Sequence, residues 1–243
     1  MEIKVYKDYQ AMSEAAAEMI KNEMKQDNHI VLGLATGSTP IGLYQKLAES
    51  CAAGEISFQH ASSYNLDEYV GIPMDHPESY HTFMNENFFK HVDFPKGATH
   101  VPWTDGVNPE VDCRAYDEAV QKAGGIDIQV LGIGGNGHIA FNEPDESFTE
   151  ETHIAYLDER TIQDNSRFFD SMEQVPKSAI TVGMGVIMKA RRVIILANGA
   201  NKADAVYKMV HGQIKPQVPA SILRLHPNVT LLLDEDAARK LKK

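Results

Sequence analysis

The stretch GIGGNGHIAFNEP, residues 132–144, contains the residue types of an acid/base site. Its glycines let the backbone approach a ligand closely, His138 stands among them, and Glu143 follows five residues later. A histidine transfers protons near neutral pH, and a nearby carboxylate can orient it. We interpret His138 and Glu143 as catalytic candidates. A metal site is not expected here, because no second histidine or cysteine lies at ligand spacing.

A second stretch, VLGLATGSTP at residues 31–40, joins an apolar run to small hydroxyl residues and then to a helical pattern. The free N–H groups at a helix start attract phosphate, and hydroxyl groups add donors. Pro40 suits the first helical position, with Ser38 or Thr39 as N-cap. The alternative is an ordinary capped turn. We favour an anion site, although the loop is not a P-loop, since no Gly-Lys-Ser/Thr follows.

Further candidates come from three other segments. Asp67 in NLDEYVGI directly follows an expected strand, where a carboxylate can serve as a general base or can simply be a solvated loop acid. Arg167 in NSRFF has a guanidinium fork that suits phosphate, although a surface arginine is the commoner case. Lys202 in LANGANK lies where a helix begins, so a bound anion would offset its unfavourable interaction with the helix dipole.

Short apolar runs alternate with helical patterns along the chain. The expected strands are 29–35, 61–66, 126–134, 178–183, 191–198 and 228–234, and the expected helices lie near 8–26, 40–53, 77–91, 108–123, 160–171 and 200–212. This alternation predicts an open α/β fold with a mostly parallel sheet. Ligands bind at the carboxyl ends of such strands, which is where the candidate stretches fall. We expect one domain over 1–243, with a lid around 142–170.

Composition limits the classes of partner. The chain has 243 residues, and its 23 basic and 34 acidic residues give a net charge of −11, which argues against nucleic acid as partner. The two cysteines, Cys51 and Cys113, suit a reducing compartment. No segment has the pattern of a signal peptide or a membrane span. We therefore expect a cytoplasmic protein that does not bind membranes.

Together these stretches resemble one family. The motifs LGLATGSTP, YNLDEYVGI, HPESYHTFM, GIGGNGHIAFNEP, NSRFF and LHPNVTLLLDE occur in the order found in glucosamine-6-phosphate deaminases, over about residues 30 to 236. The resemblance implies a Rossmann-like α/β sheet with helices on both faces, related to phosphogluconolactonases and ribose-5-phosphate isomerases. It also implies amino-sugar breakdown, in which glucosamine 6-phosphate and water give fructose 6-phosphate and ammonia.

The resemblance also implies roles for individual residues. His138, positioned by Glu143 and Asn136, would move a proton between O1 and the ring oxygen O5 to open the sugar. Asp67 would take the proton from C2 and pass it to C1. No metal or organic cofactor is implied. Matches to the family's phosphate site fall on a loop and two cations: Ala35, Thr36, Gly37, Ser38, Arg167 and Lys202.

Departures from the family pattern carry expectations of their own. Asn136 replaces an aspartate of some members, so it can orient His138 by hydrogen bonding but not by charge. Hexameric members are activated by N-acetylglucosamine 6-phosphate at a basic site between subunits. Segment 145–159 is acidic instead, with Ala155 where a basic residue is expected. We expect an unregulated monomer, with a homo-oligomer as the alternative.

Two other functions remain open from the sequence. The same fold could serve a related sugar-phosphate lactonase or isomerase, although a lactonase needs no acceptor for a C2 proton. The same pocket could belong to a non-catalytic phosphosugar sensor. The presence of Asp67, His138 and Glu143 favours the deaminase over both.

Overall fold

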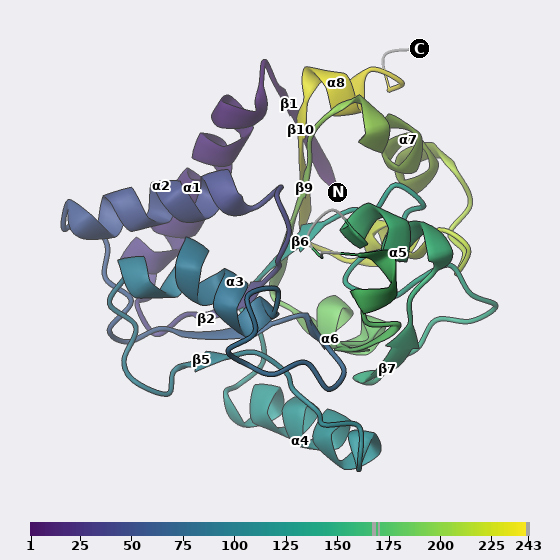
Figure 1. Ribbon diagram of the computed structural model, residues 1–243. Helices are drawn as coiled ribbons and strands as arrows, with labels where there is room; N and C mark the ends of the chain where they lie inside the picture. Colours follow the sequence, from purple (N-terminus) through teal and green to yellow (C-terminus); the bar gives the residue numbers. More distant parts are fainter. Residues whose placement is uncertain (167–168, 170, 242–243) are drawn as a thin grey trace.

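The computed structural model describes residues 1–166, 169 and 171–241 (Figure 1). Seven parallel strands form the main sheet in the order β1-β10-β9-β6-β2-β3-β5. Their bounds are β1 Glu2–Tyr6, β2 Val31–Leu34, β3 Ser62–Asn65, β5 Thr99–His100, β6 Ile128–Gly132, β9 Arg192–Ala197 and β10 Val229–Asp234. The predicted open, mostly parallel α/β fold is confirmed.

Helices lie on both faces of this sheet. The α-helices are α1 Tyr9–Gln26, α2 Ile41–Ala52, α3 Tyr80–Asn87, α4 Pro109–Lys122, α5 Glu159–Asn165, α6 Met184–Lys189, α7 Ala203–His211 and α8 Glu235–Ala238. Buried apolar side chains of α1, α2 and α3 pack on one face, and those of α4, α6, α7 and α8 pack on the other. Figure 1 shows α1, α2 and α3 together on one side of the sheet.

The central strands are buried because both faces are covered. In β9 and β10, five of the six side chains and all six, respectively, are buried. Continuous apolar runs such as VIILA and VTLLL are therefore typical of strands between two helical layers, and they set the position of each strand end. The loops that leave these ends carry most of the candidate residues.

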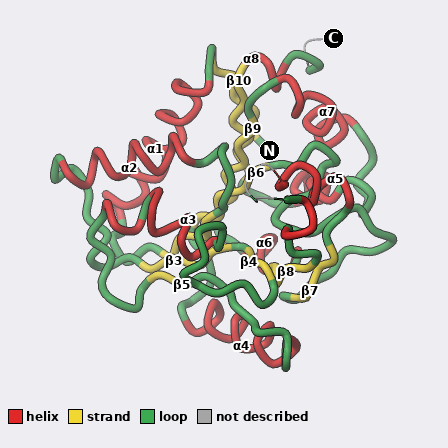
Figure 2. Tube along the Cα trace, viewed as in Figure 1, coloured by secondary structure: helices red, strands yellow, loops and turns green. Residues whose placement is uncertain are grey.

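A second sheet was not anticipated. Three short strands, β4 Asp67–Tyr69, β7 His153–Tyr156 and β8 Ser178–Thr181, pair antiparallel in the order β4-β8-β7. Figure 2 shows β7 and β8 apart from the column of β6, β9 and β10. The run at 178–183 was expected in the main sheet. Its partners gave no strand signal, because β4 has only three residues, two of them acidic, and β7 has no buried side chain. β4 carries Asp67 away from the main sheet, directly after β3.

Several other elements lie outside the sequence expectations. The edge strand β1 was missed because it lacks a buried apolar run, and its side chains are half-buried or exposed. α8 has only four residues and begins at a cap made by Asp234, which accepts a hydrogen bond from the Ala237 N–H at 2.8 Å. Among the helices that the structure describes, none has the length and apolar character needed to cross a membrane.

Candidate active site

One cavity of about 400 Å³ opens at the carboxyl ends of β2, β6 and β9. It brings together seven of the residues expected from the sequence: Ala35, Thr36, Gly37, Ser38, Asp67, His138 and Lys202. Asn136 and Glu143 do not line the cavity, but both contact His138. Arg167 lies outside the described residues. The strands place these loops side by side because all of them end at the same edge of the sheet.

His138 is held by a network of hydrogen bonds. Its Nδ1 lies 3.2 Å from Glu143 Oε2, and its backbone N–H donates to Asn136 Oδ1 at 3.1 Å. The amide of Asn136 also donates to Glu143 Oε2 at 2.7 Å, and the Thr161 hydroxyl donates to Glu143 Oε1 at 2.5 Å. With Nδ1 facing the carboxylate, the other ring nitrogen, Nε2, is the one left for a ligand.

Gly134 shows why glycine is needed beneath this histidine. A Cβ added there would lie 2.3 Å from His138 Cε1, far inside van der Waals contact. The backbone of residues 134–138 also closes on itself, with Gly134 N–H donating to the His138 carbonyl at 2.9 Å. The glycine run therefore accommodates the imidazole ring, which the sequence indicated only as close approach to something.

Glu143 is held as an anion. Burial by itself would raise its pKa, but the hydrogen bonds from His138, Thr161 and Asn136 favour the ionised form and lower the pKa from 4.5 to about 2. Such a carboxylate is charged throughout the physiological range. It can hold the imidazole in one orientation and stabilise its protonated form.

Asp67 lies in a different environment. Its side chain is only 6% exposed, at the start of β4, and it faces the cavity beside Leu66 and Tyr80. Burial, together with the negative charge of neighbouring Glu68, raises the pKa of Asp67 from 3.8 to about 8. A carboxyl group with that pKa gains and loses a proton near neutral pH, which suits an acid/base role.

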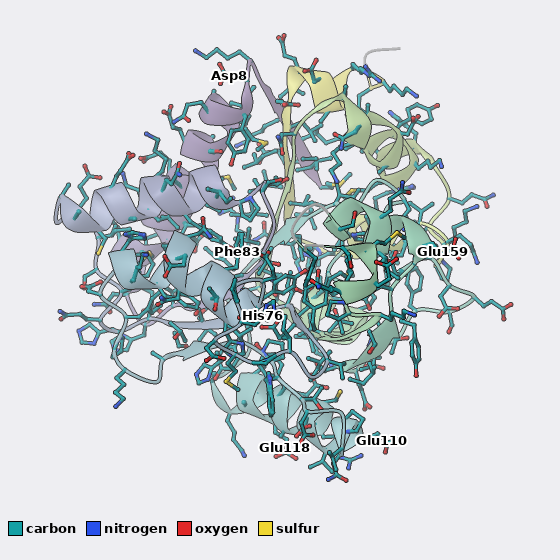
Figure 3. The ribbon with its side chains drawn as sticks, in the orientation of Figure 1. Asp8, His76, Phe83, Glu110, Glu118 and Glu159 are labelled. Carbon is teal, nitrogen blue, oxygen red and sulfur yellow. The ribbon has the colours of Figure 1, made fainter. Side chains whose placement is uncertain are left out.

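An aromatic wall closes this side of the cavity. Tyr80, the first residue of α3, lies 5.0 Å from the Tyr69 ring and 6.1 Å from the Phe141 ring, measured between centroids. His76, which Figure 3 labels before α3, stacks on Phe169 at 6.4 Å. Tyr80 was treated in the sequence as part of a helix start, and its pKa is raised well above 10 by burial. The apolar surroundings of Asp67 come largely from this wall.

The loop after β2 differs in detail from the expected capped turn. α2 begins at Ile41 with Pro40 as its N-cap residue, so the predicted caps by Ser38 or Thr39 are wrong. The Gly42 N–H instead donates to the Tyr9 hydroxyl of α1 at 2.7 Å. Tyr9 in turn donates to the Ser38 carbonyl at 3.1 Å. A distant helix thus performs the capping, which local sequence rules do not anticipate.

A second loop, after β9, lines the same cavity and contacts the first one. The Thr39 hydroxyl donates to Asn198 Oδ1 at 2.9 Å and so joins the two loops. Gly199 adopts a φ of 86°, and its N–H donates to both carboxylate oxygens of Asp234 at 3.0 and 2.9 Å. Lys202 lies in a single 3-10 turn, Ala200–Lys202, and lines the cavity. This loop can therefore present a cation to an anionic group.

Four supporting residues were missed by sequence reasoning: Thr39 in this bonding role, Thr161, Asn198 and Asp234. Asn198 and Asp234 each follow or end a parallel strand, so the rule that ligands bind at strand ends could have found them. Thr161 had no such signal, because only the fold of the segment after Phe141 brings it to Glu143. In the described part of the chain, no group of three or more His, Cys, Asp or Glu side chains is arranged to hold a metal ion.

Comparison with known proteins gives consistent results. The family described as Glucosamine-6-phosphate isomerases/6-phosphogluconolactonase matches residues 7–232. A glucosamine-6-phosphate deaminase of Thermoanaerobacter pseudethanolicus is 50% identical over 238 residues, which cover 98% of this chain and 94% of the relative. One from Clostridium perfringens is 48% identical over 242 residues, covering 100% of both chains.

Solved structures agree with this at the level of the fold. A monomeric glucosamine-6-phosphate deaminase superposes with a TM-score of 0.95 at 42% identity, covering 98% of this chain and 99% of the other. A 6-phosphogluconolactonase from Trypanosoma brucei has a TM-score of 0.75 at 22% identity, covering 99% and 98%. The second likeness shows a shared fold only.

Proposed function

The chain belongs to the glucosamine-6-phosphate isomerase/6-phosphogluconolactonase family, and within that family we propose that it is a glucosamine-6-phosphate deaminase. The observation that carries the proposal is that a single cavity is lined by Asp67, by His138 and by the two loops suited to an anion. Full-length relatives of that name at about half identity support the same activity.

The first chemical step assigned here is ring opening. His138, oriented through Nδ1 by the anion Glu143, takes the O1 proton of the pyranose and returns a proton to the ring oxygen O5. The C1–O5 bond breaks as the C1 aldehyde forms. Asn136 supports this histidine by hydrogen bonding alone, since an amide cannot ionise.

The second step is proton transfer at C2. Ionised Asp67 removes the C2 proton, which the new aldehyde acidifies, and the substrate ammonium gives a proton to O1, so that an enolamine forms. Asp67 then returns its proton to C1, which leaves a C=N bond at C2. Addition of one water at C2 and loss of one ammonia give the ketone of fructose 6-phosphate. No metal or organic cofactor enters this proposal.

The raised pKa of Asp67 fits an amino-sugar substrate. In the empty site a carboxyl group with a pKa of about 8 is mostly protonated at pH 7. A protonated amine bound within a few ångströms favours the carboxylate and lowers its pKa. The positive charge of the substrate's amine would thus create the base that acts on it, and a sugar phosphate without an amine would not.

The phosphate of the substrate is assigned to the opposite end of the cavity. In the loop Ala35–Ser38, the Ala35 N–H already donates to the Tyr44 hydroxyl at 3.1 Å, so we assign the phosphate to the later N–H groups and hydroxyls of this loop and to the cation of Lys202. We assign Arg167 to the same group. The protein has a net charge of −11, which repels an anionic substrate at long range, so this local site must supply the attraction for the phosphate.

Assembly and location are part of the proposal. We propose a monomer, supported by the solved relative that is monomeric and 42% identical. A cytoplasmic location is consistent with the two free cysteines, Cys51 and Cys113. The segment 142–170 is proposed as a lid, with α5 and Thr161 moving with the substrate.

A coupled assay tests the activity directly. The purified protein is incubated with glucosamine 6-phosphate, and ammonia and fructose 6-phosphate are measured in parallel. Equal molar release of both is the expected result. Hydrolysis of a sugar-phosphate lactone without ammonia release would replace this proposal with a lactonase, and phosphosugar binding without turnover would indicate a sensor.

A further inference from the structure

Glu68, which follows Asp67 on β4, is a fully buried carboxylate with four donors around it. Its Oε1 accepts from the N–H groups of Tyr69 at 2.9 Å and Tyr80 at 3.0 Å. Its Oε2 accepts from the N–H of His81 at 3.1 Å and lies 2.9 Å from His81 Nδ1. The Glu68 side chain is 0% exposed, so these bonds replace water entirely.

Two of these donors are the first N–H groups of α3, which have no partner inside the helix. The next N–H of the helix, that of Thr82, does not reach Glu68 and donates instead to the hydroxyl of the N-cap residue Ser79 at 3.0 Å. A carboxylate at a helix start also interacts favourably with the helix dipole. Glu68 therefore fixes where α3 begins and fastens that point to β4.

Glu68 cannot touch a ligand in the cavity. Successive side chains of a strand point to opposite faces, so Glu68 faces α3 while Asp67 faces the cavity. Tyr80 links Glu68 to the cavity. Its N–H donates to Glu68, and Tyr80 lines the cavity together with Asp67. A shift of Glu68 would move this aromatic wall. It would leave in place the phosphate loops, by which we mean the loop 35–38 and the loop after β9 with Lys202.

His81 lies between Glu68 and a second cavity. This space of about 270 Å³ lies near the sheet edge at β5 and is lined by His81, Phe89, Thr99, His100, Val101, Tyr116 and Ala119. The His81 side chain is 24% exposed, whereas its partner carboxylate is sealed from solvent. His81 is thus the partly exposed residue that separates this buried carboxylate from solvent.

We propose that Glu68 and His81 form a positioning pair for Asp67, in which Glu68 anchors the start of α3 so that Tyr80 packs against the base, and His81 holds Glu68 in that place. The inference rests on the proposed deaminase function. Glu68 also acts by charge, since burial is the larger cause of the raised pKa of Asp67 and the anion of Glu68 adds to it. Other titratable groups around Asp67 are the phenols of Tyr44, Tyr80 and Tyr116, and His138 and Lys202 across the cavity.

Glu68→Gln tests the pair, because glutamine keeps the shape but loses the charge and faces donors with its own NH₂. We expect kcat to fall about tenfold through misplacement of Tyr80. The acid limb of the kcat/KM profile should move to lower pH by about half a unit, since the anion beside Asp67 is gone. Inhibition by inorganic phosphate should stay within about twofold of wild type, because the phosphate loops are untouched.

A second pair of variants keeps the test decisive if Glu68→Gln does not fold. His81→Leu removes the ring nitrogen that contacts Glu68, and His81→Gln supplies an NH₂ donor in its place. We expect His81→Leu to lower kcat about fivefold and His81→Gln to restore most of it, with phosphate inhibition unchanged in both.

The outcomes separate this inference from the function it rests on. A wild type that releases no ammonia overturns both. An active wild type with Glu68→Gln at normal kcat and pH profile, or His81→Leu as active as wild type, overturns the pair alone. Equal losses in His81→Leu and His81→Gln, or a matching loss of phosphate inhibition, would also overturn it by showing general damage.

Discussion

Asp67 lines the cavity and Glu143 lies behind His138, and the surroundings of these two carboxyl groups shift their pKa values in opposite directions. Asp67 lies beside tyrosines and a buried anion, and its pKa is raised to about 8. Glu143 is also largely shielded, with a side chain 12% exposed, but three side-chain donors lower its pKa to about 2. Burial alone therefore does not decide the charge of a carboxyl group, because the number of donors aimed at it does.

The contrast assigns different work to the two groups. A carboxyl group that titrates near neutral pH can exchange a proton with a substrate, whereas one with a pKa near 2 is a weak base and is better suited to orienting and stabilising a neighbour. Here the neighbour of Glu143 is His138, and Asp67 has the open cavity before it.

The largest effect is expected from Asp67→Asn. The variant keeps the size of the side chain but removes the base, so kcat should fall about 10²- to 10⁴-fold. Inhibition by inorganic phosphate should be unchanged, since the proposed phosphate site consists of other residues, the loop 35–38 and Lys202. Asp75→Asn, an exposed aspartate in the loop before α3, is the matched control and should retain full activity. Turnover near wild type in Asp67→Asn would remove the base assignment.

A smaller loss is expected from Glu143→Gln. The imidazole would lose its anionic partner and its fixed orientation, and kcat should fall about 10²-fold. Thr161→Val, which removes one hydrogen bond to Glu143 and leaves its charge, should cost about fivefold. Steady-state rates on both variants rank the two contributions. If Thr161→Val were the more damaging, orientation by Glu143 would not be the main role of this network.

The two carboxyl groups should also affect stability with opposite dependence on pH. The folded-state pKa of Asp67 lies above its ordinary 3.8, so folding is disfavoured progressively as pH rises from about 4 to about 8. Asp67→Asn should therefore be more stable than wild type at pH 8 by about 1–3 kcal/mol, and equal to it near pH 4. Urea unfolding at the two pH values measures the difference.

Glu143 should behave in the reverse manner. Its folded-state pKa lies below the ordinary 4.5, so its contribution is present above that value and is lost as pH falls toward 2. Glu143→Gln should thus be less stable than wild type at pH 7, and the gap should close on acidification. The same sign of pH dependence in both variants would contradict the comparison between the two groups.

The sequence was more informative about the groups than about their surroundings. Strand-end rules and the family resemblance brought Asp67, His138 and the loop around Ser38 to one site. The opposite pKa shifts depend on contacts that no local pattern encodes, such as Thr161 reaching Glu143 from α5. The small antiparallel sheet was missed for the same reason, because strands as short as β4 exist only through their pairing with β8.

At the proposed phosphate site, the expected effect of a substitution is on substrate binding. Lys202→Ala should raise KM about tenfold and change kcat little, because phosphate is held in both the ground state and the transition state. Lys208→Ala, which removes an exposed lysine one turn and a half further along α7, is the control and should leave KM unchanged. A fall in kcat with constant KM would place Lys202 with the reacting groups instead.

The last prediction is an absence of effect: N-acetylglucosamine 6-phosphate should not activate the enzyme, and saturation should be hyperbolic. An effector needs a second site and different affinity for two states, and a phosphate effector needs cations or helix N-termini. Segment 145–159 contains six acidic residues and no lysine or arginine: Asp145, Glu146, Glu150, Glu151, Asp158 and Glu159. The cation of Lys189 lies 3.5 Å from Glu150 Oε1, so it already pairs with this segment. Rates with and without the effector, together with the mass in solution, test the prediction. A sigmoidal curve made hyperbolic by the effector would show that a regulatory site exists, and a mass near six chains would overturn the proposed monomer.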